Sequence, residues 1–119
     1  MATIIKGASA WADRASWRRT YTNASLANAT NRDLMAGQTS FFSYLGGFTV
    51  RALTACKVTI KSGTTTVFME LNLPLDTDVR IDFGMFPLKG GAVSNNWMIA
   101  HDQAVAVTLI TTAWGRIGD

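Results

Sequence analysis

The sequence predicts an all-β protein whose body is a small antiparallel β-sandwich or barrel, and three observations support this fold class. Apolar and polar residues alternate with period two on both sides of a short glycine-containing loop in residues 55–73, as in a β-hairpin with one buried face. From residue 37 onward, short apolar runs recur between turn residues at intervals of about ten positions. The tryptophans and leucines of the first 36 residues do not extend a helical repeat.

The chain divides near Gly37, where its composition changes. Its 119 residues suffice for one domain with one core, so we expect a β-sandwich domain at 37–119 and an irregular N-terminal arm at 1–36. Residues 8–35 are rich in Ala, Asn, Arg and Trp. They fit either one irregular helical turn at 10–17 or an extended arm that reaches a partner.

The sandwich domain is expected to alternate strands with turns. Gly46 and Gly47 interrupt an aromatic run, and the hairpin of residues 55–73 follows a second run. Residues 74–78 form a turn, because proline fixes φ and the Asp and Thr side chains bond their own backbone. Residues 84–96 hold three glycines, a proline and two asparagines, which is typical of a loop. The expected strands, in chain order, are residues 38–44, 48–53, 55–61, 67–73, 79–83, 97–100 and 103–112.

The last expected strand, residues 103–112, is apolar on both faces. Strand alternation places three of its side chains on one side and Ala104, Ala106 and Ile110 on the other. A strand that is buried on both faces lies in the middle of a sandwich or at a contact between subunits. The side chains of the first face, which we predict at a capsid or subunit interface, are Val105, Val107 and Leu109.

Charge and cysteine content narrow the function classes. Charged residues make up 16% of the chain, and the net charge of +3 reflects scarce acids as much as abundant bases, since Glu70 is the single glutamate. Nucleic-acid binders cluster basic and aromatic residues on one face, and the sequence shows no broad cluster of that kind, so we expect no nucleic-acid partner. The lone Cys56 cannot form an intramolecular disulfide and reads as a small core residue.

We expect no membrane segment. No stretch approaches the roughly 20 apolar residues that a bilayer-spanning helix needs. The N-terminus also lacks the basic start and long apolar middle of a signal peptide.

Catalytic and metal-binding patterns are weak. His101 is the single histidine, and its neighbour Asp102 would point to the opposite face of a strand, so the two make poor catalytic partners. Asp76, Asp78 and Asp82 are spaced somewhat like calcium ligands but lack the glycine and final glutamate of the hand-type loop, and a turn capped by Asp side chains explains them better. We therefore predict no enzyme activity, no metal and no cofactor.

One segment concentrates the residue types that dominate interface energetics. Tryptophan and arginine combine a large buried area with directional polar groups, and five of them lie within nine residues. The alternative is a solvated arginine pair with two tryptophans that close the bottom of the sandwich. The residues of this candidate interface are Trp11, Arg14, Trp17, Arg18 and Arg19.

The hairpin and the last expected strand resemble the capsid decoration, or cement, proteins of tailed bacteriophages. The residues that carry the resemblance are Lys61–Val67, Glu70–Pro74 and Asp102–Thr108, and the likeness extends over residues 55–112. It implies a jelly-roll-like β-sandwich that is dimeric or trimeric on the capsid surface. It also implies a virion protein that is made in the host cytoplasm.

The expected function is therefore structural: the protein binds the outside of an icosahedral phage capsid and stabilises it. Its partners would be the major capsid protein and copies of itself, as a homotrimer or a dimer. The segment Trp11–Arg19 or the loop 84–96 would dock on the capsid protein, and residues 103–112 would pack against symmetry mates. A carbohydrate- or receptor-binding module that uses Trp97, Phe86 or Tyr44 is the alternative, and a hydrolase that depends on His101 is the third choice.

Overall fold

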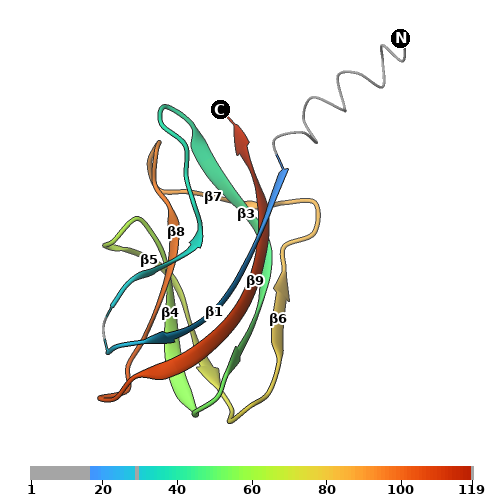
Figure 1. Cartoon of the computed structure of the whole chain (residues 1–119). Helices are drawn as coiled ribbons and strands as arrows, with labels where there is room; N and C mark the ends of the chain where they lie inside the picture. The colour runs from blue at the N-terminus through green and yellow to red at the C-terminus, as the bar shows by residue number, and fades with distance from the viewer. Residues whose placement is uncertain (1–16, 29, 119) are drawn as a thin grey trace.

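The described part of the chain forms nine β-strands in two packed layers (Figure 1). A computed structural model describes residues 17–28 and 30–118, and these residues contain no helix. The predicted all-β fold class is confirmed. The strands are β1 (Trp17–Leu26), β2 (Arg32–Met35), β3 (Phe42–Ala52), β4 (Cys56–Ser62), β5 (Thr66–Leu73), β6 (Val79–Asp82), β7 (Leu88–Lys89), β8 (Trp97–His101) and β9 (Val107–Gly118).

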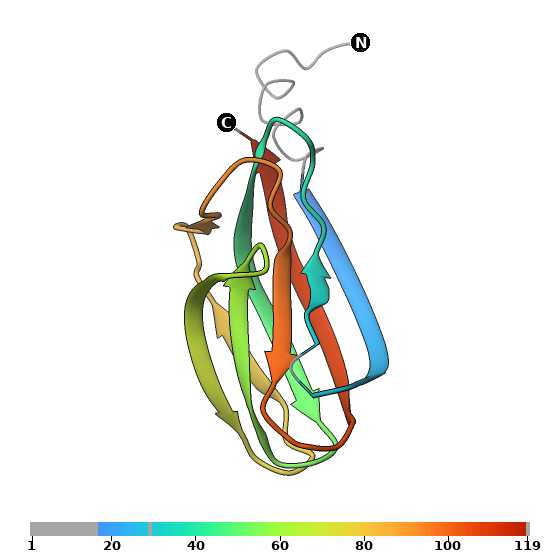
Figure 2. The same cartoon turned by 90° about the vertical axis from the view of Figure 1, so that its left-hand side faces the viewer.

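The two sheets have the strand order of a jelly roll. Sheet A runs β1-β9-β3-β6, with the short β7 also paired to β3, and sheet B runs β2-β8-β4-β5. All of the pairings are antiparallel. Figure 2 shows β4 (green) and β8 (orange) in the nearer layer with β9 (red) behind them. Successive strands lie in different sheets except in the pairs β4–β5 and β6–β7, which is the interleaving that two Greek keys produce.

The core lies between the sheets and is filled by the inward residues of alternating strands. β4 and β9 alternate buried and half-buried positions along their whole lengths, as period-two side-chain orientation requires. The Trp97 indole N–H donates to the Ser43 carbonyl oxygen across the sandwich at 3.1 Å, and the Phe68 ring meets the Trp97 ring edge-on at 4.8 Å. The largest buried side chains are Trp97, Phe48, Leu34, Met35, Leu45, Ile60 and Ile99.

The prediction of an irregular arm at residues 1–36 is wrong for Trp17–Leu26 and Arg32–Met35, which form β1 and β2. All ten residues of β1 pair with β9, and β2 pairs with β8. The inward side chains of β1 are Thr20, Thr22, Ala24 and Leu26, and their alternation with outward polar residues has little hydropathy contrast. A search for apolar periodicity therefore misses this strand.

Gly46 and Gly47 do not end a strand. β3 continues through them, and its register with β9 shifts between Leu45 and Gly47, which marks a β-bulge. The aromatic run and the following run therefore form one strand of 11 residues. Glycine inside a strand pattern indicates a bulge or a close backbone approach as well as a turn.

The predicted strand at 103–112 is displaced toward the C-terminus. β9 begins at Val107, and Val105 lies in the preceding loop with 67% of its surface exposed. Val107 and Leu109 are only 1% and 3% exposed and belong to the core. β9 lies between β1 and β3, so the strand occupies the middle of the sandwich, and these two side chains are closed to a subunit contact.

Candidate binding surface

The single histidine lies at the end of β8, where its ring joins the two sheets. His101 Nε2 is 2.5 Å from the carbonyl oxygen of Leu26, the last residue of β1, and the backbone N–H of Gln103 donates to Nδ1 at 3.1 Å. Because a backbone N–H can only donate, Nδ1 carries no proton and the Nε2 proton is directed to Leu26. Both ring nitrogens of the buried His101 therefore have backbone partners.

The neighbouring Asp102 forms hydrogen bonds with the backbone of β4. Its Oδ1 accepts the Lys57 backbone N–H at 2.9 Å and the Gln103 side-chain amide at 3.1 Å, while the Asp102 N–H donates to the Lys57 carbonyl oxygen at 3.1 Å. The hydrogen bond from Lys57 is the main cause that holds the pKa of Asp102 below its usual value, followed by the hydrogen bond from Gln103. Asp102 thus fixes the β4 and β8 ends together.

Cys56 is a core residue, as the sequence predicts. Its side chain is buried within the hydrophobic cluster and its thiol is free. Burial raises the pKa of the thiol, and the charge of the nearby Asp102 raises it further.

The structure describes three of the five predicted interface residues of the N-terminal segment. Trp11 and Arg14 lie outside the described residues. Trp17 and Arg18 belong to the backbone of β1, and Arg19 is exposed with its Cα opposite that of Trp114.

The outer face of sheet A carries a different arrangement, in which three cations stack on three aromatic rings. Arg80 of β6 lies over the Trp114 ring at 4.6 Å, and Arg116 of β9 lies over the Tyr44 ring at 4.3 Å. The Lys89 Nζ lies over the Phe42 ring at 4.1 Å. These are cation–π distances. We call this set of residues the cation–aromatic face: Phe42, Tyr44, Arg80, Lys89, Trp114 and Arg116.

The bulge in β3 provides the space for the first of these stacks. A β-carbon on Gly47 would lie 2.5 Å from Trp114 Cζ2 and 2.6 Å from the Ile81 carbonyl oxygen. Glycine at this position allows the Trp114 ring to lie against β3, which is its pairing partner. Arg80 covers the ring, and an ion pair of 3.2 Å between its Nη2 and Asp82 Oδ2 holds Arg80 in position.

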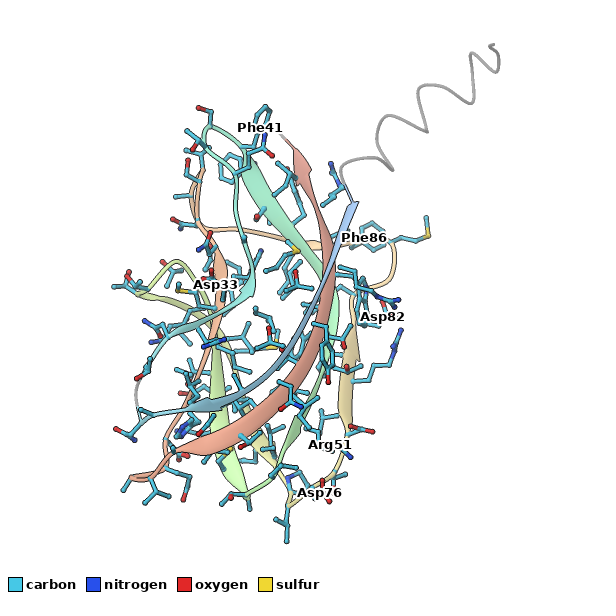
Figure 3. All side chains as sticks on the ribbon, viewed as in Figure 1. Asp33, Phe41, Arg51, Asp76, Asp82 and Phe86 are labelled. Carbon is cyan, nitrogen blue, oxygen red and sulfur yellow. The ribbon has the colours of Figure 1, made fainter. Side chains whose placement is uncertain are left out.

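The same carboxylate positions an exposed apolar tip. The backbone N–H of Gly84 donates to Asp82 Oδ1 at 2.8 Å, the Phe86 N–H donates to the Phe83 carbonyl oxygen at 3.1 Å, and Gly84 adopts a φ of +60°. The turn presents Met85 with 88% and Phe86 with 82% of their surfaces exposed. Figure 3 shows Phe86 above Asp82, on the right-hand side of the molecule, away from β4 and β8. We call Met85 and Phe86 the apolar tip.

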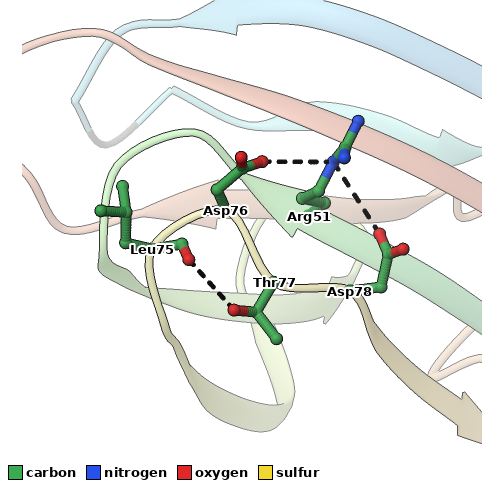
Figure 4. Close-up of polar contacts among 5 residues, drawn as sticks. All are labelled: Arg51, Leu75, Asp76, Thr77 and Asp78. Carbon is green, nitrogen blue, oxygen red and sulfur yellow. Dashed lines mark hydrogen bonds and ion pairs between the residues drawn. The ribbon is translucent and has the colours of Figure 1, made fainter.

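The acidic turn between β5 and β6 is organised by an arginine (Figure 4). Arg51 Nε lies 3.6 Å from Asp76 Oδ1 and 3.9 Å from Asp78 Oδ1, and the Thr77 hydroxyl donates to the Leu75 carbonyl oxygen at 3.0 Å. The predicted turn is confirmed, although Asp76 and Asp78 face Arg51, and of these three aspartates Asp82 is the one that accepts a hydrogen bond from a backbone amide. Among the described residues, no three His, Cys, Asp or Glu side chains gather as a metal site would require.

A polar groove of about 470 Å³ opens between β1 and β2, at the edge of the sandwich. Two of its lining residues are hydrogen-bonded to other parts of the sandwich: the Lys61 Nζ, in β4, donates to Asn31 Oδ1 at 3.1 Å, and the side-chain amide of Asn96, just before β8, donates to Asp33 Oδ1 at 2.9 Å. The groove is lined by Thr20, Thr22, Asn31, Arg32, Asp33 and Ala36.

The aromatic residues suggested for carbohydrate binding do not form a shared platform. Trp97 is buried in the core, and Tyr44 lies beneath the Arg116 guanidinium. Only Phe86 of the three is largely exposed. The suggestion of Trp97 as a binding residue is therefore wrong.

Comparison with known proteins adds no relative. No family model, curated protein or solved structure matches the chain. Within the described part of the chain, no helix is long and apolar enough to cross a membrane.

The sequence contained a partial signal for the cation–aromatic face. Period-two alternation continued past residue 112 would have put Trp114 and Arg116 on one side of a strand. Their contacts with Arg80 and Tyr44 depend on which strands pair, and no local pattern specifies that.

Proposed function

We propose that the protein is a capsid decoration protein, which binds the outside of an icosahedral phage capsid and stabilises the shell. The observation that carries this proposal is the apolar tip, because two adjacent large apolar side chains are exposed on a turn that is held by hydrogen bonds. Exposed apolar groups of this kind mark contact sites, and anchors that fill a partner's pocket dominate interface energetics.

The architecture suits adhesion. A jelly roll that presents a fixed tip and a broad face can bury area across a junction between capsid subunits, and many copies on one shell act together. The resemblance of residues 55–112 to phage decoration proteins supports the same assignment. In this proposal the protein resides on the virion surface, and its first partner is the major capsid protein.

The experiment is a binding assay with undecorated heads of the phage that encodes the chain. We expect wild-type protein to saturate the heads and Met85→Ser/Phe86→Ser to lose most of its occupancy. Leu75→Ser is the matched control, because Leu75 is also an exposed apolar loop residue, at 63%, on a different turn. Wild-type protein that does not bind heads would refute the proposed function, and equal loss in both variants would remove the tip from it.

The N-terminal segment is tested separately. Because residues 17–26 form β1 and pair with β9 along their full length, a truncation should remove only residues 1–16 and keep the sandwich intact. If this truncation lowers occupancy on heads, the predicted role of Trp11 and Arg14 is supported. Unchanged occupancy would exclude them.

Self-association is part of the proposal, as a homotrimer or a dimer. β1 pairs only with β9 among the described strands, so one edge of a ten-residue strand is available to a second copy. Light scattering of the purified protein across a concentration series measures the stoichiometry. A monomer at all concentrations would refute self-association in solution.

A carbohydrate- or receptor-binding module is the second candidate function, and the polar groove between β1 and β2 is the observation that favours it. A groove lined by hydroxyl, amide and oppositely charged side chains suits sugar hydroxyl groups better than an apolar ligand. Binding to a glycan array that is lost in Asn31→Ala/Asp33→Ala, together with no affinity for heads, would establish this alternative.

A further inference from the structure

We propose that the cation–aromatic face docks on a carboxylate-rich surface of the capsid lattice, with Arg116 and Lys89 as the principal contacts. This inference rests on the proposed function, and it names the chemistry of the partner surface. The cations of this face lie over aromatic rings, Arg116 and Lys89 have no acidic partner within the described residues, and Asp82 links the face to the apolar tip.

The cation–aromatic face presents cations to a partner and not ring faces, because each of its rings already has a cation over it. The cations lie 4.1 to 4.6 Å from the ring centroids. Base-binding and sugar-binding surfaces use ring faces as stacking platforms, and these rings are covered. The outermost groups of the face are therefore two guanidinium groups and one ammonium group.

Stacking positions the charged groups without neutralising them. A guanidinium that lies flat on a ring keeps its N–H edges available for bidentate contact with a carboxylate. Arg80 has Asp82 as its ion-pair partner at 3.2 Å. Within the described residues, neither Arg116 nor Lys89 forms an ion pair with an acidic side chain.

The strand register brings the two unneutralised cations close together. Tyr44 of β3 pairs with Arg116 of β9 on one side and with Lys89 of β7 on the other. Adjacent strands are about 4.8 Å apart, so the Arg116 and Lys89 backbones are separated by about 10 Å. The exposed Arg19 lies on the neighbouring β1, opposite Trp114. The complementary surface is therefore one on which several carboxylates lie close together.

The apolar tip gives the surface the composition of a protein interface. Asp82 holds both Arg80 and the turn that carries Met85 and Phe86, so the stacks and the tip have a shared support. Protein interfaces combine apolar anchors with a charged and polar rim, and complementary charge at the rim speeds and orients encounter. This combination favours an acidic protein surface over a nucleic acid, whose phosphates would not use the tip.

The test compares Lys89→Gln/Arg116→Gln with a matched control, Lys57→Gln/Lys61→Gln. Both double variants lose two positive charges, and the control changes the outer face of sheet B, where Lys57 pairs with Glu70 and Lys61 with Asn31. On undecorated heads at low salt, we expect the face variant to bind about tenfold more weakly than wild type and the control to bind like wild type. Raising the salt should narrow that difference. Equal binding by the two double variants would overturn the inference.

Immobilised poly-L-glutamate provides a readout that does not depend on heads. Wild-type protein and the control should be retained at low salt, and the face variant should elute earlier. If wild type fails on heads but the poly-L-glutamate result holds, the proposed function fails while the carboxylate-binding face stands. Equal retention of wild type and face variant, tighter binding to duplex DNA than to poly-L-glutamate at equal salt, or a changed oligomeric state in the face variant would each overturn the inference.

Discussion

The Trp114 ring lies against the backbone of Gly47, at the place where a side chain on Gly47 would stand. A β-carbon there would approach Trp114 Cζ2 to 2.5 Å and the Ile81 carbonyl oxygen to 2.6 Å. The ring can shift, but the Ile81 carbonyl belongs to the backbone of β6, which pairs with β3 at this point. Gly47 is therefore required both by the Trp114–Arg80 stack and by the β3–β6 pairing.

Gly47→Ala is expected to lower the free energy of unfolding by about 1–3 kcal/mol, the usual range for overpacking. It should also change the near-ultraviolet circular dichroism of Trp114. Urea unfolding and the spectrum of the folded variant measure the two effects. Gly91→Ala is the control, since a β-carbon there would make only ordinary van der Waals contacts, with two Thr66 atoms at 3.5 and 3.7 Å and with Ser62 Oγ at 3.8 Å, and it should stay within about 0.5 kcal/mol of wild type. A stable Gly47→Ala variant with an unchanged spectrum would contradict the role given to Gly47.

The hairpin was predictable because its signal is local. Strands expected at 55–61 and 67–73 are observed as β4 (Cys56–Ser62) and β5 (Thr66–Leu73). The alternation of apolar and polar residues around Ser62-Gly63-Thr64 contains both the strand period and the turn. Each neighbour needed to form this unit lies within the same short segment.

The remainder of the fold depends on information that no local window holds. β1 has small inward residues, so its alternation is weak. The bulge at Gly46 and Gly47 has the same local composition as a turn, and only the pairing of β3 with β9 distinguishes the two. The cation–aromatic face likewise joins Arg80 to Trp114 through three strands that are far apart in the sequence.

His101 supplies the next prediction, because its two hydrogen bonds can be separated by substitution. His101→Ala leaves the Leu26 carbonyl and the Gln103 N–H without their ring partners and should cost about 2–4 kcal/mol of stability, since each buried unmet group costs about 1–3 kcal/mol. His101→Asn retains an acceptor near the Nδ1 position and His101→Gln a donor near Nε2, so both should be intermediate. The measurement is urea denaturation of all three variants. Full stability of His101→Ala would show that neither hydrogen bond matters.

Asp102 predicts an acid-sensitive contribution to stability. Its pKa is lowered in the folded protein, first by the Lys57 backbone N–H and then by the Gln103 side chain. A group whose folded pKa is depressed stabilises the fold above its unfolded pKa, and this contribution disappears as the pH falls through the folded pKa. The urea midpoint of wild type should therefore fall between pH 5 and the acid limit more steeply than that of Asp102→Asn. Parallel acid profiles for the two proteins would contradict the assigned hydrogen bonds.

Cys56 predicts that the stability of the fold decreases as the pH rises in the alkaline range, the opposite direction to the effect of Asp102 at acid pH. Burial, followed by the charge of Asp102, raises the pKa of its thiol above the reference value of 9.0, so the unfolded chain ionises first as the pH rises. The resulting stabilisation is complete below the unfolded pKa and is lost as the pH increases toward the folded pKa. Cys56→Ala should remove this alkaline slope from urea denaturation curves.

Thiol labelling tests the same burial by a second route. Ellman's reagent requires an accessible thiolate, so native Cys56 should react slowly at pH 8 and at a rate that rises with the unfolded fraction in urea. Thr65→Cys in a Cys56→Ala background is the control, because Thr65 is exposed in the turn between β4 and β5, and this thiol should react at once without urea. Immediate labelling of native Cys56 would mean that the β4 end of the core opens readily. The two hydrogen bonds between Lys57 and Asp102 that close this end would then contribute little to the stability of the fold.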